Sequence, residues 1–330
     1  MKKSNKIAVF GGGLWGTALA QHLCRGGSQA VSLWEFYREA AVSLSKTRRH
    51  PHIPGFRLDD SVAVTDDLRA AVQGAEVLIF VLPSPVIRAT ARAVAAALGG
   101  RKVAVVNAAK GLEPGSLKTM GEVLEEELPK SPVYTLTGPS FAREVARGVP
   151  TKLLLGGRPG PLAERLRKLF DGGALRVAST PDRKGIELGG SLKNVLAIGA
   201  GILDGLGAGA NTKAALLVQG LAEMAALAEA SGGRAESVHG LAGLGDLIAT
   251  GTSSESRNRA FGEKLGAGLA HGQALKEIPT VVEGVDAAHG AAALARKRQV
   301  KAPLLAAVWQ VVHGGRRPQT LLNALGFRGA

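Results

Sequence analysis

One lysine stands alone in a long apolar stretch of the second half of the chain. Lys193 is the only cationic residue between Ile186 and Ile202, a segment whose spacing predicts a helix. A charge inside such a helix has to be paired or functional, because burying it without a partner is costly. Desolvation would lower the pKa of the ammonium group and suit it to proton transfer. The alternative is a lysine whose long side chain reaches solvent.

A single carboxylate lies among glycines and leucines further along the same half. Asp246 falls within the segment Gly240–Leu247, and it is a candidate to pair with Lys193 and orient its ammonium group. The alternative is that Asp246 caps the N-terminus of a helix, a position that aspartate often occupies.

A polar segment follows, and it ends where another helical pattern begins. It runs from Thr250 to Asn258 and carries Ser256 and Arg257. A hydroxyl, a guanidinium and an amide at the start of a helix suit the phosphate group of a substrate. The same residues would also serve as plain helix caps, and the two interpretations are compatible.

Three glycines near the N-terminus have the spacing G-x-G-x-x-G. They are Gly11, Gly13 and Gly16, between the strand pattern Ile7–Phe10 and a helical pattern. In a dinucleotide-binding turn the first glycine permits the tight turn, the second lets the backbone approach a pyrophosphate, and the third lets helix pack on strand. The alternative is a flexible glycine turn, but the strand before it and the helix after it favour the dinucleotide site.

An acidic residue ends the second predicted strand. Glu35 is at the position where a carboxylate binds the ribose 2′-hydroxyl of NAD and repels the 2′-phosphate of NADP. Arg38, Arg48 and Arg49 follow and could receive that phosphate. The residues favour NAD slightly and leave NADP open, so the expected cofactor is NAD(P)H.

The elements that position these residues change character along the chain. Short apolar runs alternate with helical patterns in the first half, and Val77–Leu82 is apolar at every position, which is typical of a strand in a parallel sheet. Long helical patterns follow, mainly Gly185–Asp204 and Lys213–Ala230, with a stop at Ser231–Gly233. The other predicted strands are Ile7–Phe10, Val31–Trp34, Val62–Val64, Val103–Val106, Val133–Leu136 and Lys152–Leu155, and the predicted helices of the first half are Leu14–Arg25, Pro85–Leu98 and Ser116–Leu128.

This alternation predicts an α/β protein with a Rossmann-type doubly wound sheet followed by an all-helical C-terminal domain. We expect a dinucleotide-binding domain over residues 1–180 and a helical substrate-binding domain over 181–330, divided near Thr180–Asp182. The loops after parallel strands gather at one edge of a sheet, so Lys110 is expected near the nicotinamide, although a surface lysine is the alternative. The glycine turn and Lys193 are then expected to face a shared cleft.

Composition narrows the function classes. The net charge is +14, but the basic residues are scattered without interleaved aromatics, so we expect no nucleic-acid partner. The glycines between Ile7 and Ala20 argue against a secretory signal there, and the single Cys24 fits a reducing compartment, so a cytoplasmic protein without stable membrane insertion is expected. The seven histidines show no paired ligand spacing, and we expect no metal site.

The motifs together resemble the bacterial NAD(P)-dependent glycerol-3-phosphate dehydrogenases, from Ile7 to about Phe327. The motifs that carry this resemblance are Gly11–Ala20, Lys110–Glu113, Gly138–Ala142, Leu192–Val195, Gly243–Leu247, Ser256–Arg259 and Val281–Gly284. The resemblance implies reduction of dihydroxyacetone phosphate to sn-glycerol 3-phosphate for phospholipid synthesis, and in many members a homodimer.

The resemblance also implies a role for each matching residue, with Lys193 as proton donor and acceptor. The expected catalytic residues are Lys193, Lys110 and Asp246. The expected substrate-binding residues are Lys110, Gly138, Ser140, Lys193, Asn194, Asp246, Thr250, Ser256, Arg257 and Asn258. The expected cofactor-binding residues are Gly11, Gly13, Leu14, Trp15, Gly16, Glu35, Arg49, Lys110, Ala142, Arg257, Val281 and Glu283.

Three other functions remain open from the sequence. A reductase of 3-hydroxy or 2-keto acids, of the ketopantoate type, also joins a Rossmann domain to helices and uses a lysine, but its substrate is a carboxylate without the phosphate. A dinucleotide sensor would need the glycine turn without Lys193, Asp246 and Arg257 together. Nucleic-acid binding would rest on the positive charge alone. The chain also departs from the resembling family at Ala109, Arg143 and the segment 35–38, and the last leaves the cofactor preference open.

Overall fold

The computed structural model describes residues 5–25, 29–278 and 280–327. The chain forms two compact units. The first contains residues up to Ala109 and Met120–Arg183, and the second contains Lys110–Thr119 and the chain from Lys184 onward. The sequence did not indicate that Lys110–Thr119 belongs to the helical unit. The expected boundary between the two functional domains, at residues 180 and 181, remains a prediction.

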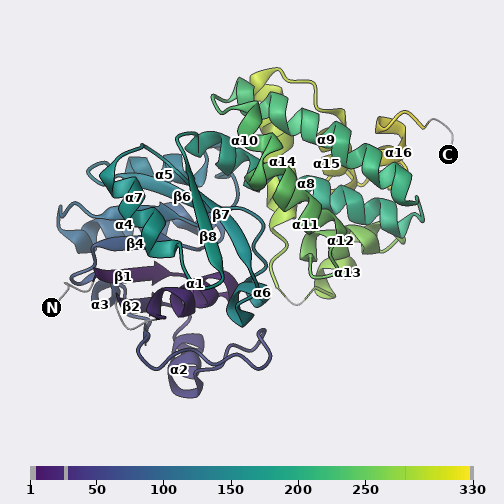
Figure 1. The fold of residues 1–330 in the computed structure, drawn as a ribbon. Helices are drawn as coiled ribbons and strands as arrows, with labels where there is room; N and C mark the ends of the chain where they lie inside the picture. The colour runs from purple at the N-terminus through teal and green to yellow at the C-terminus, as the bar shows by residue number, and fades with distance from the viewer. Residues whose placement is uncertain (1–4, 26–28, 279, 328–330) are drawn as a thin grey trace. The chain divides into compact units, whose positions relative to one another are not determined.

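The first unit is built on an eight-stranded sheet with the order β3-β2-β1-β4-β5-β6-β7-β8 (Figure 1). Its strands are β1 Asn5–Phe10, β2 Gln29–Trp34, β3 Ala63–Thr65, β4 Val77–Phe80, β5 Ala104–Asn107, β6 Val133–Thr137, β7 Thr151–Gly156 and β8 Leu175–Thr180. The neighbours are parallel except β6 and β7. The strand order reverses at β1, and the crevice between β1 and β4 at such a switch point is where doubly wound sheets bind ligands.

Alternate residues of the strands supply two separate apolar layers. Ile7 and Val9 of β1 pack into one layer with α1, α2, α6 and α7, whereas Ala8 and Phe10 pack into the other with α3, α4 and α5. Both faces of the sheet are therefore covered, which is why β4 is buried at every position. The helices are α1 Leu14–Cys24, α2 Arg38–Thr47, α3 Leu68–Val72, α4 Ser84–Leu98, α5 Met120–Glu127, α6 Ala142–Arg147 and α7 Pro161–Phe170.

The sheet confirms the predicted Rossmann-type fold and corrects three details. β8 was not predicted, although Leu175 and Val177 alternate with exposed residues as a half-covered strand should. β7 runs antiparallel to β6, a direction that a local pattern does not encode. The helix predicted from Ser116 begins only at Met120, because Leu117 adopts a positive φ of 62° and Leu112 pairs with Thr119 in a short bridge.

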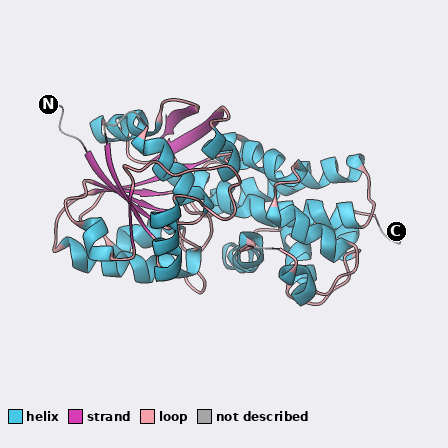
Figure 2. Cartoon of the chain, turned by 90° about the horizontal axis from the view of Figure 1, so that it is seen from below, coloured by secondary structure: helices cyan, strands magenta, loops and turns pink. Residues whose placement is uncertain are grey.

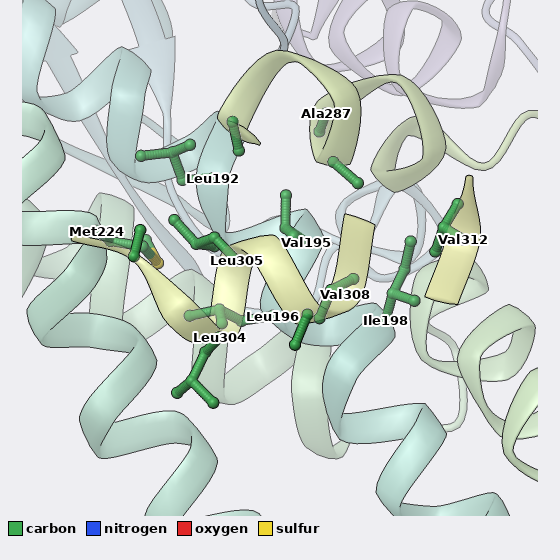
Figure 3. Packing of buried hydrophobic residues seen from close by; sticks show 14 of the residues in the cluster. Leu192, Val195, Leu196, Ile198, Met224, Ala287, Leu304, Leu305, Val308 and Val312 are labelled. Atoms are coloured by element: carbon green, nitrogen blue, oxygen red, sulfur yellow. The ribbon is translucent and has the colours of Figure 1, made fainter. Parts of the chain in front are cut away.

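The second unit contains only helices between Lys184 and Phe327, apart from Pro279, which lies outside the described residues (Figure 2). They are α8 Arg183–Gly205, α9 Ala210–Ala230, α10 Ala235–His239, a π-helical turn Leu241–Gly245, α11 Asp246–Thr252, α12 Arg257–Gly266, α13 His271–Lys276, α14 Glu283–Arg298, α15 Pro303–Val312 and α16 Thr320–Ala324. Every residue of α8 from Gly185 to Leu203 is buried. Figure 3 shows Val195, Leu196 and Ile198 of α8 beside Leu305 and Val308 of α15.

Glycines allow α8 and α12 to cross at close range. A Cβ added to Gly201 would lie 1.9 Å from the Arg259 carbonyl oxygen, and one added to Gly262 would lie 2.0 Å from the Ile198 carbonyl oxygen. Gly205 and Gly266 repeat the pattern one turn further along. The backbones therefore approach more closely than any side chain would permit. This contact fixes the start of α12 against the helix that carries Lys193.

Helix α8 is long and apolar enough to cross a membrane by length and composition, but its apolar window is completely buried inside the structure. It is the central helix around which the second unit packs. The prediction that Lys193 lies in a buried apolar helix is therefore confirmed.

Candidate functional site

The glycine turn after β1 has the geometry of a dinucleotide-binding loop. Gly11 adopts a φ of 118°, and a Cβ there would lie 2.4 Å from the Val81 carbonyl oxygen. A Cβ on Gly16 would lie 1.9 Å from the Gly11 carbonyl oxygen, so α1 packs directly on the turn. A Cβ on Gly13 would meet nothing within 4 Å. The open space lies at the glycine whose backbone should approach a pyrophosphate, which fits a dinucleotide.

Gly13 is also the N-cap of α1, and no side chain caps this helix end. The backbone N–H groups of Leu14, Trp15 and Gly16 form the first turn, where the helix dipole favours an anion. The sequence placed all three in the cofactor site. The turn therefore provides the donors and the positive helix end that a pyrophosphate requires.

The peptide of Gly12, in the middle of the turn, is held from both sides. Its N–H donates to Glu35 Oε2 at 3.0 Å, and its carbonyl accepts from Thr17 Oγ1 at 3.0 Å. His50 also bonds to the Gly12 backbone, while the Nδ1 of its ring accepts from the His52 N–H at 3.2 Å. Burial lowers the pKa of His50, and His52 adds to this effect. Sequence reasoning found Glu35 but missed His50, for which the pattern gave no signal.

The remaining predicted residues of the first unit follow β6 or end α2. Gly138 adopts a φ of 141°, and Ser140 Oγ donates to its carbonyl at 3.0 Å. Ala142 begins α6, which contacts α1, and Trp15 and Ala142 pack against the same apolar layer. Arg49 is exposed beyond the end of α2, and its place in a cofactor site remains a prediction.

A cluster of charged side chains lies inside the second unit. Lys193 Nζ of α8 is 2.9 Å from Asp246 Oδ1 and donates to Thr250 Oγ1 at 2.6 Å. Lys110 Nζ is 2.6 Å from the other carboxylate oxygen, Asp246 Oδ2. Thr250 Oγ1 donates to Asp246 Oδ1 at 3.2 Å. The pairing of Asp246 with Lys193 that the sequence predicted is confirmed, and the carboxylate also receives a second lysine.

Burial and charge act against each other in this cluster. Burial and the nearby Lys110 charge lower the pKa of the Lys193 ammonium while Asp246 raises it, and the net result is a fall from the ordinary 10.5 to about 8. Burial would raise the pKa of the Asp246 carboxyl, but Lys110 and Lys193 outweigh this and hold it below its ordinary value. Near pH 8, Lys193 can therefore both give and take a proton while Asp246 stays ionised.

Local backbone features bring the three charged groups together. The π-helical turn Leu241–Gly245 leads directly into α11, so Asp246 lies in the first helical turn, where the dipole favours a carboxylate. Ser191, two residues before Lys193, accepts a hydrogen bond from the Gly111 N–H at 2.8 Å. This bond ties the segment that carries Lys110 to α8. Ser191 was missed by the sequence analysis, although a buried serine in an apolar helix was a signal available there.

A second polar network links α8, α12 and α14. Asn194 Nδ2 donates to Glu283 Oε2 at 3.3 Å, and Asn258 Nδ2 donates to Asn194 Oδ1 at 2.9 Å. Asn258 Oδ1 in turn accepts from the Gly284 N–H at 2.9 Å. The structure therefore brings together Asn194, Asn258 and Glu283, which the sequence had assigned separately to substrate and cofactor.

The start of α12 carries the predicted phosphate ligands. Ser256 is its N-cap, with Oγ accepting from the Arg259 N–H at 3.1 Å, so the capping interpretation holds. Arg257 NH1 donates to Thr280 Oγ1 at 3.0 Å and to the Val281 carbonyl at 2.8 Å. A half-buried guanidinium at a positive helix end is suited to a phosphate. Among the described residues, no group of three histidine, cysteine or acidic side chains could hold a metal ion.

Comparison with known sequences gives matches over nearly the whole chain. The sequence model described as NAD-dependent glycerol-3-phosphate dehydrogenase N-terminus matches residues 6–159, and the model of the C-terminus matches residues 182–323. The chain belongs to the NAD-dependent glycerol-3-phosphate dehydrogenase family. The glycerol-3-phosphate dehydrogenase [NAD(P)+] of Nitratidesulfovibrio vulgaris is 42% identical over 97% of both chains, and that of Desulfitobacterium hafniense is 40% identical over 98% of this chain and 92% of its own.

Solved structures agree with this membership. A glycerol-3-phosphate dehydrogenase from Coxiella burnetii superposes with a TM-score of 0.94 and 35% identity, covering 98% of this chain and 99% of its own. A ketopantoate reductase from Ralstonia eutropha superposes with a TM-score of 0.55 at 18% identity, covering 89% of this chain and 99% of its own, so it shares the fold alone. The predicted family resemblance is confirmed, and the chain is an NAD(P)-dependent oxidoreductase of this family.

Proposed function

We propose that this chain reversibly reduces dihydroxyacetone phosphate to sn-glycerol 3-phosphate with NAD(P)H, and that Lys193 is the group that gives and takes the proton. The observation that carries the proposal is the buried cluster of Lys193, Asp246, Thr250 and Lys110 within a glycerol-3-phosphate dehydrogenase chain. A lysine with a pKa of about 8 can work in both directions near neutral pH.

The protein's part in the reaction is to bind, orient and protonate the substrate. When bound, the reduced nicotinamide supplies a hydride to the ketone carbon. Negative charge then grows on the carbonyl oxygen, and the Lys193 ammonium stabilises this charge and donates its proton to the oxygen. In the reverse direction the neutral Lys193 amine accepts the hydroxyl proton. Asp246 holds the Lys193 ammonium through its 2.9 Å contact and balances the charge of Lys110.

The phosphate group of the substrate is assigned to the start of α12. Arg257 offers a guanidinium that its bonds to Thr280 and Val281 hold in place, and the helix end adds a positive dipole. Phosphate binding away from the reacting carbon helps to orient the ketone. Lys110, Asn194, Asn258, Gly138 and Ser140 are further proposed substrate ligands.

A spectrophotometric assay tests this function. Oxidation of NADH and of NADPH should depend on dihydroxyacetone phosphate, and dihydroxyacetone without its phosphate should be reduced far more slowly. A 2-keto acid such as ketopantoate is the control for the rival reductase that shares the fold. Turnover of ketopantoate but not of dihydroxyacetone phosphate would reject the proposed substrate.

We also propose that the protein acts as a cytoplasmic homodimer whose product serves phospholipid synthesis. These proposals rest on the resemblance to the bacterial enzymes. Sedimentation equilibrium of the purified chain should give twice the 33.9 kDa mass of one chain. A mass equal to one chain at micromolar concentration would contradict the dimer.

A further inference from the structure

The carboxyl ends of β1 and β2 bring one carboxylate to the glycine turn. The two strands are parallel, and Phe10 of β1 pairs with Trp34 of β2, so the residues after them leave the sheet side by side. Gly11 N–H also donates to the Trp34 carbonyl at 2.9 Å. Glu35 therefore lies beside the turn through the sheet register itself.

Both oxygens of Glu35 are fixed by backbone amides. Oε2 accepts the Gly12 N–H at 3.0 Å, and Oε1 accepts the Tyr37 N–H at 2.9 Å. A Cβ on Gly12 would lie 2.6 Å from Oε2, so the carboxylate lies directly over the glycine. Each carboxylate oxygen can accept more than one hydrogen bond, so capacity remains for a hydroxyl donor. The carboxylate is held in one place and accepts hydrogen bonds only.

The arginines that could neutralise a phosphate here are placed differently. Arg48 has a side chain only 10% exposed, and its NH2 group donates to the carbonyls of Asp59 and Val62. Arg38 extends into solvent with 86% of its side chain exposed, and its Nε is 3.9 Å from Asp66 Oδ2. The Arg48 guanidinium is thus already hydrogen-bonded to the loop before β3, and the Arg38 guanidinium lies close to the carboxylate of Asp66.

The residues around Glu35 add acidity and aromatic surface. Phe36 and Tyr37 follow Glu35 directly, and both rings are exposed. Asp66 and Asp67 follow β3, whose last residue, Thr65, accepts the Glu35 N–H at 3.0 Å. A group bound beside Glu35 therefore meets carboxylates and aromatic rings, and the solvent-exposed arginines of this region are Arg38, which faces Asp66, and Arg49 beyond the end of α2.

We propose that this chain uses NADH in preference to NADPH and that Glu35 determines the preference. The ribose 2′-hydroxyl of NADH donates to the fixed carboxylate, whereas the 2′-phosphate of NADPH meets its negative charge. This inference rests on the proposed function, because it specifies which nicotinamide the enzyme binds. It settles a choice that the sequence, with three nearby arginines, left open.

Steady-state kinetics with dihydroxyacetone phosphate test the preference. The kcat/KM for NADH should exceed that for NADPH by about tenfold or more, since like charges at a binding site cost at least the equivalent of one decade in affinity. In Glu35→Gln the ratio should fall by about tenfold, chiefly through a lower KM for NADPH. Glu39→Gln, an exposed residue of the same charge on α2, is the matched control and should leave the ratio unchanged.

Equal use of both cofactors, preference for NADPH, or an unaltered ratio in Glu35→Gln would overturn the inference. If Glu35→Gln does not fold, titration of the wild-type chain with NAD+ and NADP+ decides it, because NAD+ should bind about tenfold more tightly or better. Weaker or equal NAD+ binding would overturn the inference. A chain that binds NAD+ tightly but never reduces dihydroxyacetone phosphate would reject the proposed function and leave this inference standing.

Discussion

At the scale of single residues, the proposed chemistry depends on one carboxylate that serves two lysines. Asp246 contacts Lys193 through one oxygen and Lys110 through the other, and all three groups belong to the second unit. Burial disfavours the charge on Lys193, while Asp246 favours it, and the pKa of Lys193 falls to about 8 as the net result. The pKa of the proposed proton donor is therefore set by its partners as well as by its burial.

The pKa of Lys193 predicts opposite pH dependences for the two directions. Reduction requires the ammonium form, so kcat/KM for dihydroxyacetone phosphate should fall as pH rises above about 8. Oxidation requires the neutral amine, so kcat/KM for sn-glycerol 3-phosphate should rise up to about the same pH. Initial rates across pH 6 to roughly 10 in both directions measure this. The account is wrong if both profiles fall together in that range.

Replacing Asp246 by asparagine should move the reduction profile to lower pH. Without the carboxylate, burial and the Lys110 charge act on Lys193 unopposed, so the pKa of Lys193 should fall by about a unit or more. Asp286→Asn, an exposed acid in the first turn of α14, is the control for charge alone. An inflection that stays in place in Asp246→Asn, with activity retained, would show that the carboxylate does not tune the lysine.

At the scale of secondary-structure elements, the second unit uses one helix to cap another. Glu223 of α9 accepts the N–H groups of Leu304 and Leu305 at 2.9 to 3.1 Å, at the start of α15. Burial raises the pKa of Glu223, and the two backbone hydrogen bonds oppose that rise. A buried carboxylate is retained here because these amides would otherwise lack a partner at the helix end.

Glu223→Ala should lower the free energy of unfolding by about 2 kcal/mol, because it leaves two buried amides without acceptors. Glu223→Gln, which keeps one oxygen acceptor, should lose less. Glu229→Ala on the exposed end of α9 is the control and should change stability by no more than about 0.5 kcal/mol. Denaturant unfolding measures the stability of all three variants. Equal stability of Glu223→Ala and Glu229→Ala would refute the idea that Glu223 caps the start of α15.

The close crossing of α8 and α12 makes a second element-scale prediction. Gly201→Ala should destabilise the chain by about 2–3 kcal/mol, because its Cβ would overlap the Arg259 carbonyl and overpacked contacts with backbone relax poorly. Gly272→Ala on α13 adds a methyl group to open space and should be neutral or slightly stabilising. Thermal unfolding compares the two. Similar melting temperatures for both variants would mean that the α8–α12 contact accommodates the added methyl group without loss of stability.

At the scale of the whole molecule, the sequence predicts the local features and the pairing of Lys193 with Asp246, but it misses most other contacts between distant positions. The glycine turn could be predicted because its three glycines lie in one short segment between a predicted strand and a predicted helix. Lys193 was readable because a lone charge in an apolar helix requires a partner. The bond between Lys110 and Asp246 joins positions 136 residues apart, and no local pattern reports it.

The same limit explains the missed features of the fold. The antiparallel direction of β7 depends on how the chain returns after α6, not on the apolar residues of the strand itself. The late start of α5 depends on the positive φ of Leu117, which non-glycine residues seldom adopt. Segment Lys110–Thr119 belongs with the helical unit through Leu112 in its core and the bond from Gly111 to Ser191.

The proposed cofactor turn and the proposed catalytic cluster lie in different units, so their functions should be separable by one substitution. Lys193→Met removes the proton donor in the second unit and leaves the glycine turn of the first unit unaltered. Its NADH affinity, followed by cofactor fluorescence, and its circular dichroism should match those of the wild type. Lys301→Met, at an exposed position after α14, is the matched control.

The most direct measurement is the rate of dihydroxyacetone phosphate reduction by Lys193→Met at saturating NADH. The account predicts that kcat falls by about two orders of magnitude or more, the usual contribution of a general acid, while Lys301→Met keeps the wild-type rate. A folded Lys193→Met protein that binds NADH and turns over at a rate close to wild type would contradict it.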